Sequence, residues 1–446
     1  MQTNPRTRRA VRHRHEVGQV ADVVDGSIFR SQTSTGPAMY RYHRGPVLVL
    51  IPLCVLAACG DAARDQDVLT LVVAGQALVK VDPRQSWDDP FGTVRPIVEA
   101  ADVSFTNFEM AINGLDNQCN LPDDYVTVLG EPRISPEDQP GNVSNPHAVE
   151  APVMEFLASL GFNLMSLSNN HIWDLGECGV EVTRATADRY GVTHAGAGAT
   201  AEEAVAPAYM DVGGTTFALV AATTSHDERQ YIARNVNGVW TGHQDDWDRN
   251  IDAVQEAARH ADIVIYYQHF QIDVDEFAGL ADGEATTDGH IKVDDVGQWQ
   301  TDFARAIIDA GASMYIGHGH RGFDGVEIYQ GRPLFRQLGG FAYQGLNPNI
   351  GHYDQYRPWS GLLARMTIDS DSVRSIELIP LELDEGAGYR DQYDDFEFLM
   401  RRGLAEVATD ETAVAILHMF RELSEEYGTE VEIRGERAFV ELGGLN

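Results

Sequence analysis

The chain is short of basic residues, and this shortage narrows the range of its partners. Lysine and arginine together number 33 against 68 aspartates and glutamates, which gives a formal net charge of -35. Such a surface repels nucleic acids, so we exclude them as partners. One interpretation is that the negative charge serves only to keep the protein soluble. The other is that the protein binds an anionic substrate, in which case a metal ion or local arginines must offset the negative charge at the binding site. Because 43% of the 446 residues are hydrophobic, the chain has enough apolar side chains for a large core.

Several catalytic motifs are also missing. The sequence has no G-x-S-x-G, no phosphate-binding P-loop and no Cys-x-x-Cys zinc pattern. The segment Val72-Val-Ala-Gly75 contains too little glycine for a dinucleotide fingerprint. We find no internal repeat. No catalytic motif of these classes therefore competes with a metal site as the interpretation of the remaining motifs.

The first 59 residues predict an exported lipoprotein. Residues 1–38 lack apolar periodicity, and we interpret them as disordered or as a mis-assigned start before Met39. Residues 39–59 combine a short basic stretch with an apolar run, as in a signal peptide. That run is shorter than the roughly 20 residues that a membrane-spanning helix needs. Its ending, Leu56-Ala-Ala-Cys59, resembles the bacterial lipobox, in which Cys59 is acylated; an ordinary secretion signal is the alternative. We therefore expect a lipid anchor to the membrane, on the outer face of the cytoplasmic membrane or in the periplasm.

Cysteine is scarce, with four residues in the chain. Cys54 would leave with the signal peptide, and Cys59 would carry the lipid. Cys119 and Cys178 remain, and an exported protein permits a disulfide between them. The sequence leaves open whether they meet.

Strand-type and helix-type segments alternate after a polar tether at 60–67, which predicts an α/β fold. After Pro333 the pattern is rich in strands and indicates a second sheet with antiparallel strands. We divide the chain into a main domain at 68–382 and an extension at 383–446 that packs on it. Strands are expected at 68–74, 103–108, 163–167, 217–222, 263–267, 314–316, 334–337, 361–368, 373–380 and near 431–442, with a break at Gly75. Helices are expected at 90–101, 151–160, 179–190, 246–261, 301–310 and 411–427.

Polar side chains follow several predicted strands, at the position where α/β sheets bind ligands. Imidazole nitrogens together with carboxylate or amide oxygens suit divalent Mn, Zn or Fe. Each residue also has a structural interpretation, such as His269 as a hydrogen-bonded core histidine or Glu109 as the partner of an arginine. Their joint occurrence at strand ends favours a metal site. The residues are Gln76, Asn107, Glu109, Asn170, His171, Asp174, His269, His318 and His320.

These segments resemble the CapA family in residue type and order. CapA proteins are named for capsule and poly-γ-glutamate synthesis and are related to calcineurin-like metallophosphoesterases. The resemblance covers roughly residues 69–380. The segments are Asn107-Phe-Glu109, Leu167-Ser-Asn-Asn-His171-Ile-Trp-Asp174-Leu-Gly176, Ala195-Gly-Ala-Gly198, Gln268-His269-Phe, the run at 300–312, Gly317-His-Gly-His320 and Gln337-Leu-Gly-Gly340.

The resemblance implies a metallophosphatase-like sandwich of two mixed β-sheets flanked by helices. It also implies a divalent metal ion at the strand ends. His171 or Asp174 would donate a proton or support the residues that bind the metal. The implied metal ligands are Glu109, Asn170, His269, His318 and His320.

The chain departs from the family pattern at three places. Gln76 stands where the family has aspartate, and an amide oxygen is a weaker ligand than a carboxylate. The family's His-Trp-Gly-x-Glu is His269-Phe-Gln-Ile-Asp273 here. Its Gly-His-x-Pro-His becomes Gly317-His-Gly-His320-Arg321. We therefore expect one metal ion or none rather than two, with Gln76, Asn107 and Arg321 as weak or indirect contacts.

Three functions follow from these observations. The first is a metal-dependent hydrolase of phosphoester or amide bonds that acts in capsule or poly-γ-glutamate synthesis or export. The second is a non-catalytic component that binds the anionic capsule polymer or its precursor through a degenerate site. The third is a metal-dependent receptor for a small ligand. Metal identity, substrate and oligomeric state are not determined by the sequence.

Overall fold

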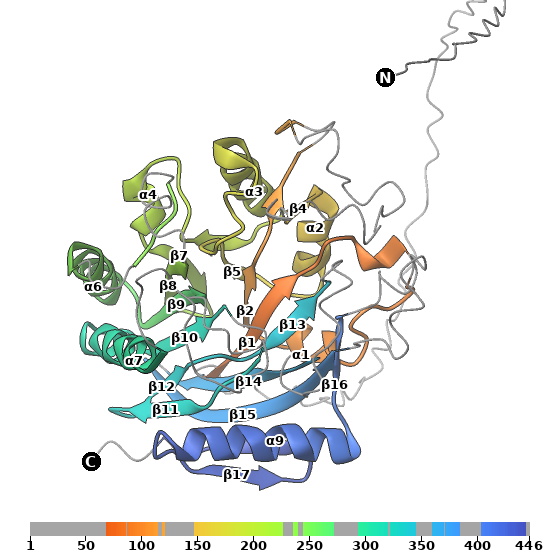
Figure 1. The fold of residues 1–446 in the computed structure, drawn as a ribbon, viewed down its shortest axis with the longest axis vertical. Coiled ribbons are helices and arrows are strands. Elements are labelled where there is room, and N and C mark those ends of the chain that lie inside the picture. Colours follow the sequence, from red (N-terminus) through yellow and green to blue (C-terminus); the bar gives the residue numbers. More distant parts are fainter. Residues whose placement is uncertain are drawn as a thin grey trace, which may run out of the picture. The chain divides into compact units, whose positions relative to one another are not determined.

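Two mixed β-sheets form the body of the described chain (Figure 1). The first sheet contains β1 (Val68–Leu78), β2 (Val103–Phe108), β5 (Leu164–Ser166), β6 (Thr193–Ala195), β13 (Gly340–Tyr343), β14 (Ser360–Asp369), β15 (Ser372–Leu383), β16 (Ala405–Val407), β17 (Val431–Arg434) and β18 (Arg437–Val440). The second contains β7 (Ala208–Val212), β8 (Thr215–Ser225), β9 (Ile263–Gln271), β10 (Met314–His318), β11 (Val326–Tyr329) and β12 (Arg332–Phe335). A short pair joins β3 (Ala111–Ile112) to β4 (Ala148–Val149).

This computed structural model describes residues 68–85, 87–114, 118–120, 147–225, 235–239, 244–271, 293–319, 322–344, 359–369, 371–383 and 403–442. The predictions made for residues 1–67, including the lipidated Cys59, lie outside these residues. So do Asp273, His320 and Arg321. No helix within the described ranges is long and apolar enough to cross a membrane.

Both sheets contain parallel and antiparallel neighbours. In the first sheet β1, β2, β5 and β6 run parallel, and β14, β15, β18 and β17 continue from β1 in antiparallel pairs. In the second sheet β8, β9, β10 and β12 run parallel, and β7 and β11 are antiparallel edge strands. The parallel strands of both sheets therefore end at defined edges, where their next residues can meet.

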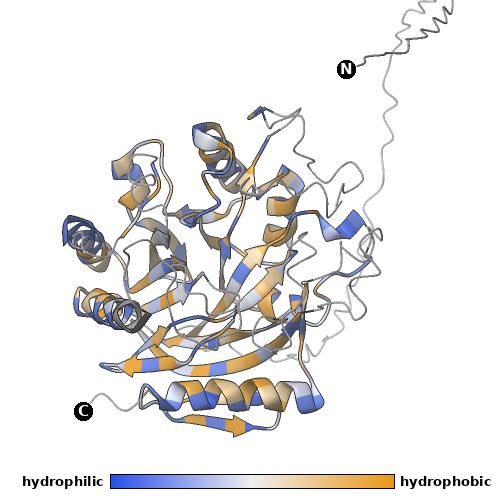
Figure 2. Cartoon of the chain, in the orientation of Figure 1, coloured by the Kyte–Doolittle hydropathy of each residue, from blue (hydrophilic) through white to orange (hydrophobic). Residues whose placement is uncertain are grey.

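Helices cover the outer faces of the sheets. One layer contains α1 (Arg95–Glu99), α2 (Ala151–Ser159) and α3 (Gly176–Arg189), and the other contains α4 (Ala201–Val205), α6 (Gln244–Ala258) and α7 (Val293–Asp309). A 3-10 turn, η1 (Pro83–Gln85), follows β1, and α9 (Asp410–Glu425) packs on β15 and β17. Figure 2 shows how hydropathy differs between the two kinds of element: the strands carry many apolar residues, whereas α6, on the outside, is largely hydrophilic.

The core follows the two-residue period of the strands. Leu71 and Val73 of β1 lie in the apolar cluster between the sheets, whereas Val72 faces the layer that contains α2 and α3. In β9, Tyr267 lies between the sheets and Tyr266 faces α6 and α7. This arrangement confirms the predicted sandwich of two mixed sheets flanked by helices.

Several predicted boundaries were wrong. The strand β1 does not break at Gly75 but continues to Leu78, with a register shift against its neighbours between Val73 and Gln76. Gly75 is needed because a Cβ there would lie 1.8 Å from the carbonyl oxygen of Gly339. The helix expected at 90–101 forms only at Arg95–Glu99. Phe91 has a φ of 63°, which is incompatible with an α-helix at that position.

Candidate metal centre

Three of the predicted ligands come together at the strand ends. His269 of β9 and His318 of β10 are paired directly across the two parallel strands. Glu109 follows β2 in the opposing sheet, one residue after Phe108. Ligand atoms of the three side chains all lie within 4.8 Å of one another, and the residues are between 0% and 2% exposed. Two sheets thus contribute one buried carboxylate and two imidazoles to a single point.

The spacing of these groups fits a shared cation. Glu109 Oε1 lies 3.9 Å from His269 Nε2, which is too long for a hydrogen bond. Two ligands on opposite sides of one ion, each at about 2.1 Å, would be separated by about 4.2 Å. Glu109, His269 and His318 are therefore able to hold a metal ion, and their N and O atoms suit Mn, Zn or Fe.

A backbone carbonyl sets the orientation of His318. His318 Nε2 lies 2.8 Å from the carbonyl oxygen of Gly339, which only accepts hydrogen bonds, so Nε2 carries the proton. The lone pair of the neutral ring is then on Nδ1. The same oxygen accepts a hydrogen bond of 3.2 Å from the backbone nitrogen of Gln76. Gly339 therefore links the end of β1 to the His318 ring.

A histidine–aspartate pair lies beside the carboxylate of Glu109. His171 Nδ1 is 2.7 Å from Asp174 Oδ2, and His171 Nε2 is 4.0 Å from Glu109 Oε1. The backbone nitrogen of His147 donates to the same Asp174 oxygen at 2.5 Å, and the His147 ring stacks on His171 with centroids 3.5 Å apart. The sequence singled out His171 and Asp174 but not His147. Asp174 accordingly holds His171 with Nδ1–H as the donor and Nε2 directed toward the buried group.

Asn169 fixes the turn that carries His171. Its side-chain oxygen accepts hydrogen bonds from the backbone nitrogens of His171 (3.0 Å) and Ile172 (2.9 Å). Its amide donates to the carbonyl oxygen of Phe108 at 2.8 Å, directly before Glu109. Asn169 is fully buried. This residue therefore sets the distance between His171 and Glu109, a role that the sequence motif alone did not reveal.

Lys80 is a charged residue near the site that sequence reasoning missed. It is 6% exposed and lies just beyond β1. Burial lowers the pKa of Lys80 from 10.5 to about 7, although the charges of Asp174 and Glu109 oppose that shift. Burial also disfavours the charged form of Tyr267, two residues before His269. Burial, and then the charge of Glu109, raise the pKa of Tyr267 well above its usual value. Both shifts reflect the poor solvation of charge at buried positions.

The remaining predicted residues occupy neighbouring positions. Gln76 and Asn107 are paired in register on β1 and β2, and both are buried. The Asn107 side-chain oxygen accepts a 3.3 Å hydrogen bond from Asn169, so this residue contacts the His171 turn. Asn170 lies in that turn and its side-chain oxygen is buried. The structure places these amides around the site without showing which of them binds a metal.

Cys119 and Cys178 form a disulfide with a Cα–Cα distance of 5.5 Å. Cys178 belongs to α3, and the backbone nitrogen of Cys119 donates to the side chain of Asn113, just after β3. The sequence left this pairing open. The bond joins the segment after β3 to the helix that follows Asp174.

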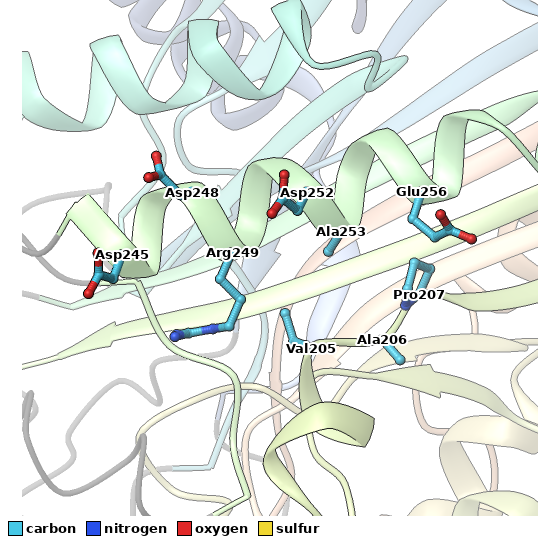
Figure 3. Close-up of a pocket in the computed structure, with 9 residues that line it drawn as sticks. All are labelled: Val205, Ala206, Pro207, Asp245, Asp248, Arg249, Asp252, Ala253 and Glu256. Carbon is cyan, nitrogen blue, oxygen red and sulfur yellow. The ribbon is translucent and has the colours of Figure 1, made fainter.

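A separate hollow of about 550 Å³ lies on the surface at α6 (Figure 3). Its side chains come from α6 and from the segment at 205–207. Four carboxylates and one arginine line it, so it is poorly suited to an anionic ligand. None of the residues of the metal centre lines it. The lining residues are Val205, Ala206, Pro207, Asp245, Asp248, Arg249, Asp252, Ala253 and Glu256.

Comparison with known proteins relates this chain to capsule synthesis proteins. Residues 55–344 match the sequence profile of the family described as bacterial capsule synthesis protein PGA_cap. The chain is 25% identical over 273 residues to PGA biosynthesis protein CapA of Bacillus subtilis, covering 61% of each protein. It is 20% identical over 331 residues to capsule biosynthesis protein CapA of Bacillus anthracis, covering 73% of this chain and 70% of that protein. An uncharacterized protein of Sinorhizobium fredii, y4sH, is 22% identical and covers 84% of this chain and 94% of its own.

Proposed function

The chain belongs to the family of bacterial capsule synthesis proteins PGA_cap, and we propose that it is a metal-dependent hydrolase of phosphoester or amide bonds within capsule or poly-γ-glutamate synthesis. One observation supports the hydrolase proposal above the others. A buried Glu109–His269–His318 group lies next to a His171–Asp174 pair, with His171 Nε2 4.0 Å from Glu109 Oε1. A cation site beside an oriented imidazole is the arrangement that hydrolysis requires.

Glu109, His269 and His318 would hold the metal ion, and the amide oxygen of Asn170 is the candidate for a fourth ligand. When bound, a divalent cation supplies Lewis acidity toward a phosphoryl or carbonyl oxygen and lowers the pKa of a water molecule to about 7. We assign two functions to the burial of these residues. It excludes competing water, and it strengthens the attraction between the ligands and the ion because the local dielectric constant is low.

His171 is the proton donor in this proposal. The Asp174 carboxylate accepts the proton of His171 Nδ1 in a hydrogen bond and thereby stabilises the doubly protonated ring. The proton on Nε2 can then pass to the leaving oxygen or nitrogen of the substrate. The His147 ring stacks on His171 and restricts its rotation. Proton transfer by an oriented side chain typically contributes a factor of about 10² to 10⁴ to a rate.

We place this chemistry outside the cytoplasm. The proposal follows from the predicted signal peptide at 39–59 and from the predicted lipidation of Cys59. The Cys119–Cys178 disulfide supports it, because such bonds persist in oxidising compartments. An anionic polymer, or a precursor of it, is the proposed partner, and the local cations of the site would offset repulsion by the acidic surface.

Metal content and phosphoester hydrolysis together test this function. The mature protein, purified without chelators and supplied in turn with Mn²⁺, Zn²⁺ and Fe²⁺, should retain a divalent ion and hydrolyse bis-p-nitrophenyl phosphate or a γ-glutamyl amide. His269→Ala should lose both properties, whereas His171→Ala should keep the metal and lose turnover. His260→Ala, which changes an exposed histidine, is the matched control. Wild-type protein that neither retains metal nor hydrolyses any of these substrates would refute the proposal.

Gln76 favours a second candidate, a polymer-binding component without catalysis. A neutral amide in place of a carboxylate weakens cation binding at the end of β1. This function predicts that the protein binds poly-γ-glutamate with an affinity that His269→Ala leaves unchanged, with no turnover in either protein. Turnover that disappears in His269→Ala would exclude it.

A further inference from the structure

The Cys119–Cys178 disulfide lies close in sequence to the carboxylate that orients the proton donor. Cys178 is in the first turn of α3, four residues after Asp174. The backbone nitrogen of Gly176, between them, donates to the carbonyl oxygen of Trp173 at 2.8 Å. Because this stretch of chain is short and hydrogen-bonded, a shift of Cys178 is transmitted to Asp174.

The other cysteine is tied to the segment that carries His147. The backbone nitrogen of Cys119 donates to the side-chain oxygen of Asn113 at 3.0 Å. The nitrogen of Asn113 donates to the carbonyl oxygen of Val149 at 2.9 Å, and the nitrogen of Ala111 donates to that of His147 at 2.9 Å. These bonds hold the short β3–β4 pair together. Cys119 and His147 therefore belong to one connected piece of structure.

The two connections close a ring of contacts at the proton donor. The nitrogen of His147 donates to Asp174 Oδ2 at 2.5 Å, and the His147 ring stacks on His171. Thr183 of α3 also contacts β3, since its hydroxyl oxygen accepts a 2.8 Å hydrogen bond from the nitrogen of Ile112. The β3–β4 pair has only two residues in each strand, and so short a pair is marginally stable by itself. The disulfide closes the ring covalently and adds a constraint that these hydrogen bonds supply only weakly.

Both cysteines are within reach of thiol reagents, because each is partly exposed. The bond forms when the two thiols transfer two electrons and two protons to a disulfide oxidant, whose own S–S bond breaks to give a dithiol. Reduction by a dithiol reverses the exchange. Since the cytoplasm keeps thiols reduced, the chain lacks this constraint before export.

We propose that the Cys119–Cys178 disulfide is a positioning element of the site, which holds the His147 segment against Asp174 and thereby keeps His171 oriented as proton donor. The hydrolase then reaches full activity only after the two cysteines have been oxidised outside the cytoplasm. This inference rests on the proposed function, because it concerns the proton donor of the same site.

Hydrogen–deuterium exchange at single-residue resolution tests the inference without reference to turnover. The mature protein is compared as oxidised wild type, as wild type reduced with dithiothreitol, and as the double variant Cys119→Ser, Cys178→Ser. We expect exchange of the His147 amide to be about tenfold faster in the two proteins without the bond. The Thr70 amide, which donates to Asp102 Oδ2 at 2.8 Å, is the matched control and should change far less.

Steady-state kinetics with Mn²⁺ and bis-p-nitrophenyl phosphate connect this movement to the proton donor. Reduction of wild type should lower kcat by about 10- to 10²-fold, because a displacement of about 1 Å is enough for such a loss. KM and metal content should stay nearly unchanged, and oxidised glutathione should restore kcat. Dithiothreitol should leave the double cysteine variant unaffected, which shows that the reductant does not act on the metal. Asn163→Ala, whose contacts lie at the other end of β2, should lose stability but keep the kcat of wild type.

The outcomes separate this inference from the proposed function. An equal rate of His147 exchange in oxidised and reduced protein overturns the inference. Equal acceleration of the Thr70 amide does so too, because the bond would then stabilise the fold in general. Faster His147 exchange with an unchanged kcat overturns the connection to the proton donor. If oxidised wild type shows no turnover, the proposed function fails, and the exchange rates still decide whether the disulfide positions His147.

Discussion

The imidazole Nδ1 of His171 lies 2.7 Å from the carboxylate oxygen Oδ2 of Asp174, so the aspartate determines which ring nitrogen is directed toward Glu109. Asp174→Asn preserves the shape but supplies no charge to stabilise the protonated ring. We predict that turnover falls by about 10² to 10⁴ while metal content is unchanged. Steady-state kinetics with parallel metal analysis measure both quantities. Asp188→Asn is the control, because Asp188 contacts His194 in a similar pair at 3.2 Å. Equal losses in the two variants would contradict the role of Asp174.

Asn169→Ala should weaken both stability and metal binding. The substitution leaves the Phe108 carbonyl and two backbone N–H groups without their partner, at a cost of about 3 kcal/mol in the free energy of unfolding. Loss of the turn should reduce metal affinity about tenfold.

Asn163→Ala provides the matched comparison for Asn169. Asn163 makes the same kind of contacts at the other end of β2, with the nitrogen of Ser104 and the oxygen of Asp102. We expect it to lower stability but to leave metal affinity within twofold of wild type. Urea unfolding and metal titration of both variants decide the point. An unchanged metal affinity in Asn169→Ala would show that the turn is not part of the site.

Lys80→Met should change how stability depends on pH. Burial lowers the pKa of Lys80 from 10.5 to about 7, so between these values the unfolded chain binds a proton that the folded chain does not. Wild type therefore loses stability as pH falls through this window, and the loss is complete below about 7. Relative to wild type, Lys80→Met should gain stability toward low pH, by at most about 5 kcal/mol. Urea unfolding of both proteins between pH 6 and pH 10 measures the difference, and a difference independent of pH contradicts it.

The disulfide should contribute substantially to stability. It joins residues 59 positions apart, and a loop of that length corresponds to at most about 4 kcal/mol of stabilisation through the unfolded chain. The double variant Cys119→Ser, Cys178→Ser should unfold at a lower urea concentration than wild type. Dithiothreitol should shift the unfolding midpoint of wild type to that of the variant and leave the variant unaffected. A midpoint that is the same in all four conditions would show that the bond adds nothing.

The sequence predicted the α/β class and a second sheet because its strands leave clear local signals, whereas the sandwich arrangement was implied by the family resemblance. Apolar runs identified β2, β9 and β10, and alternation with helices indicated the α/β class. The boundary at Gly75 was predicted wrongly because glycine usually interrupts a strand. In this fold the missing side chain instead allows β1 to approach Gly339, 264 residues later, which is a packing constraint with no local signal.

The residues of the site were predictable where a possible metal ligand stands near the end of a predicted strand. Glu109 follows β2, His318 closes β10 and His269 lies two residues before the end of β9. The parallel register of β9 and β10 pairs the two histidines, and the opposing sheet supplies Glu109. Lys80, His147 and Asn169 were not predicted as site residues, because their roles depend on contacts between distant segments. His147 meets His171 only through the β3–β4 pair and the turn at Asp174. For Lys80 a signal was available, namely the rarity of lysine in a chain rich in arginine.

The central claim is that Glu109, His269 and His318 hold one divalent ion, and the metal content of the purified protein tests it most directly. Wild type, the triple variant Glu109→Gln, His269→Ala, His318→Ala and the control His260→Ala would be dialysed against Mn²⁺, Zn²⁺ or Fe²⁺ and measured by mass spectrometry of the elements. We predict about one ion per chain in wild type and control, and less than a tenth of that in the triple variant, provided that its circular dichroism is native. Wild type without bound metal, or a folded triple variant that retains it, would contradict the claim.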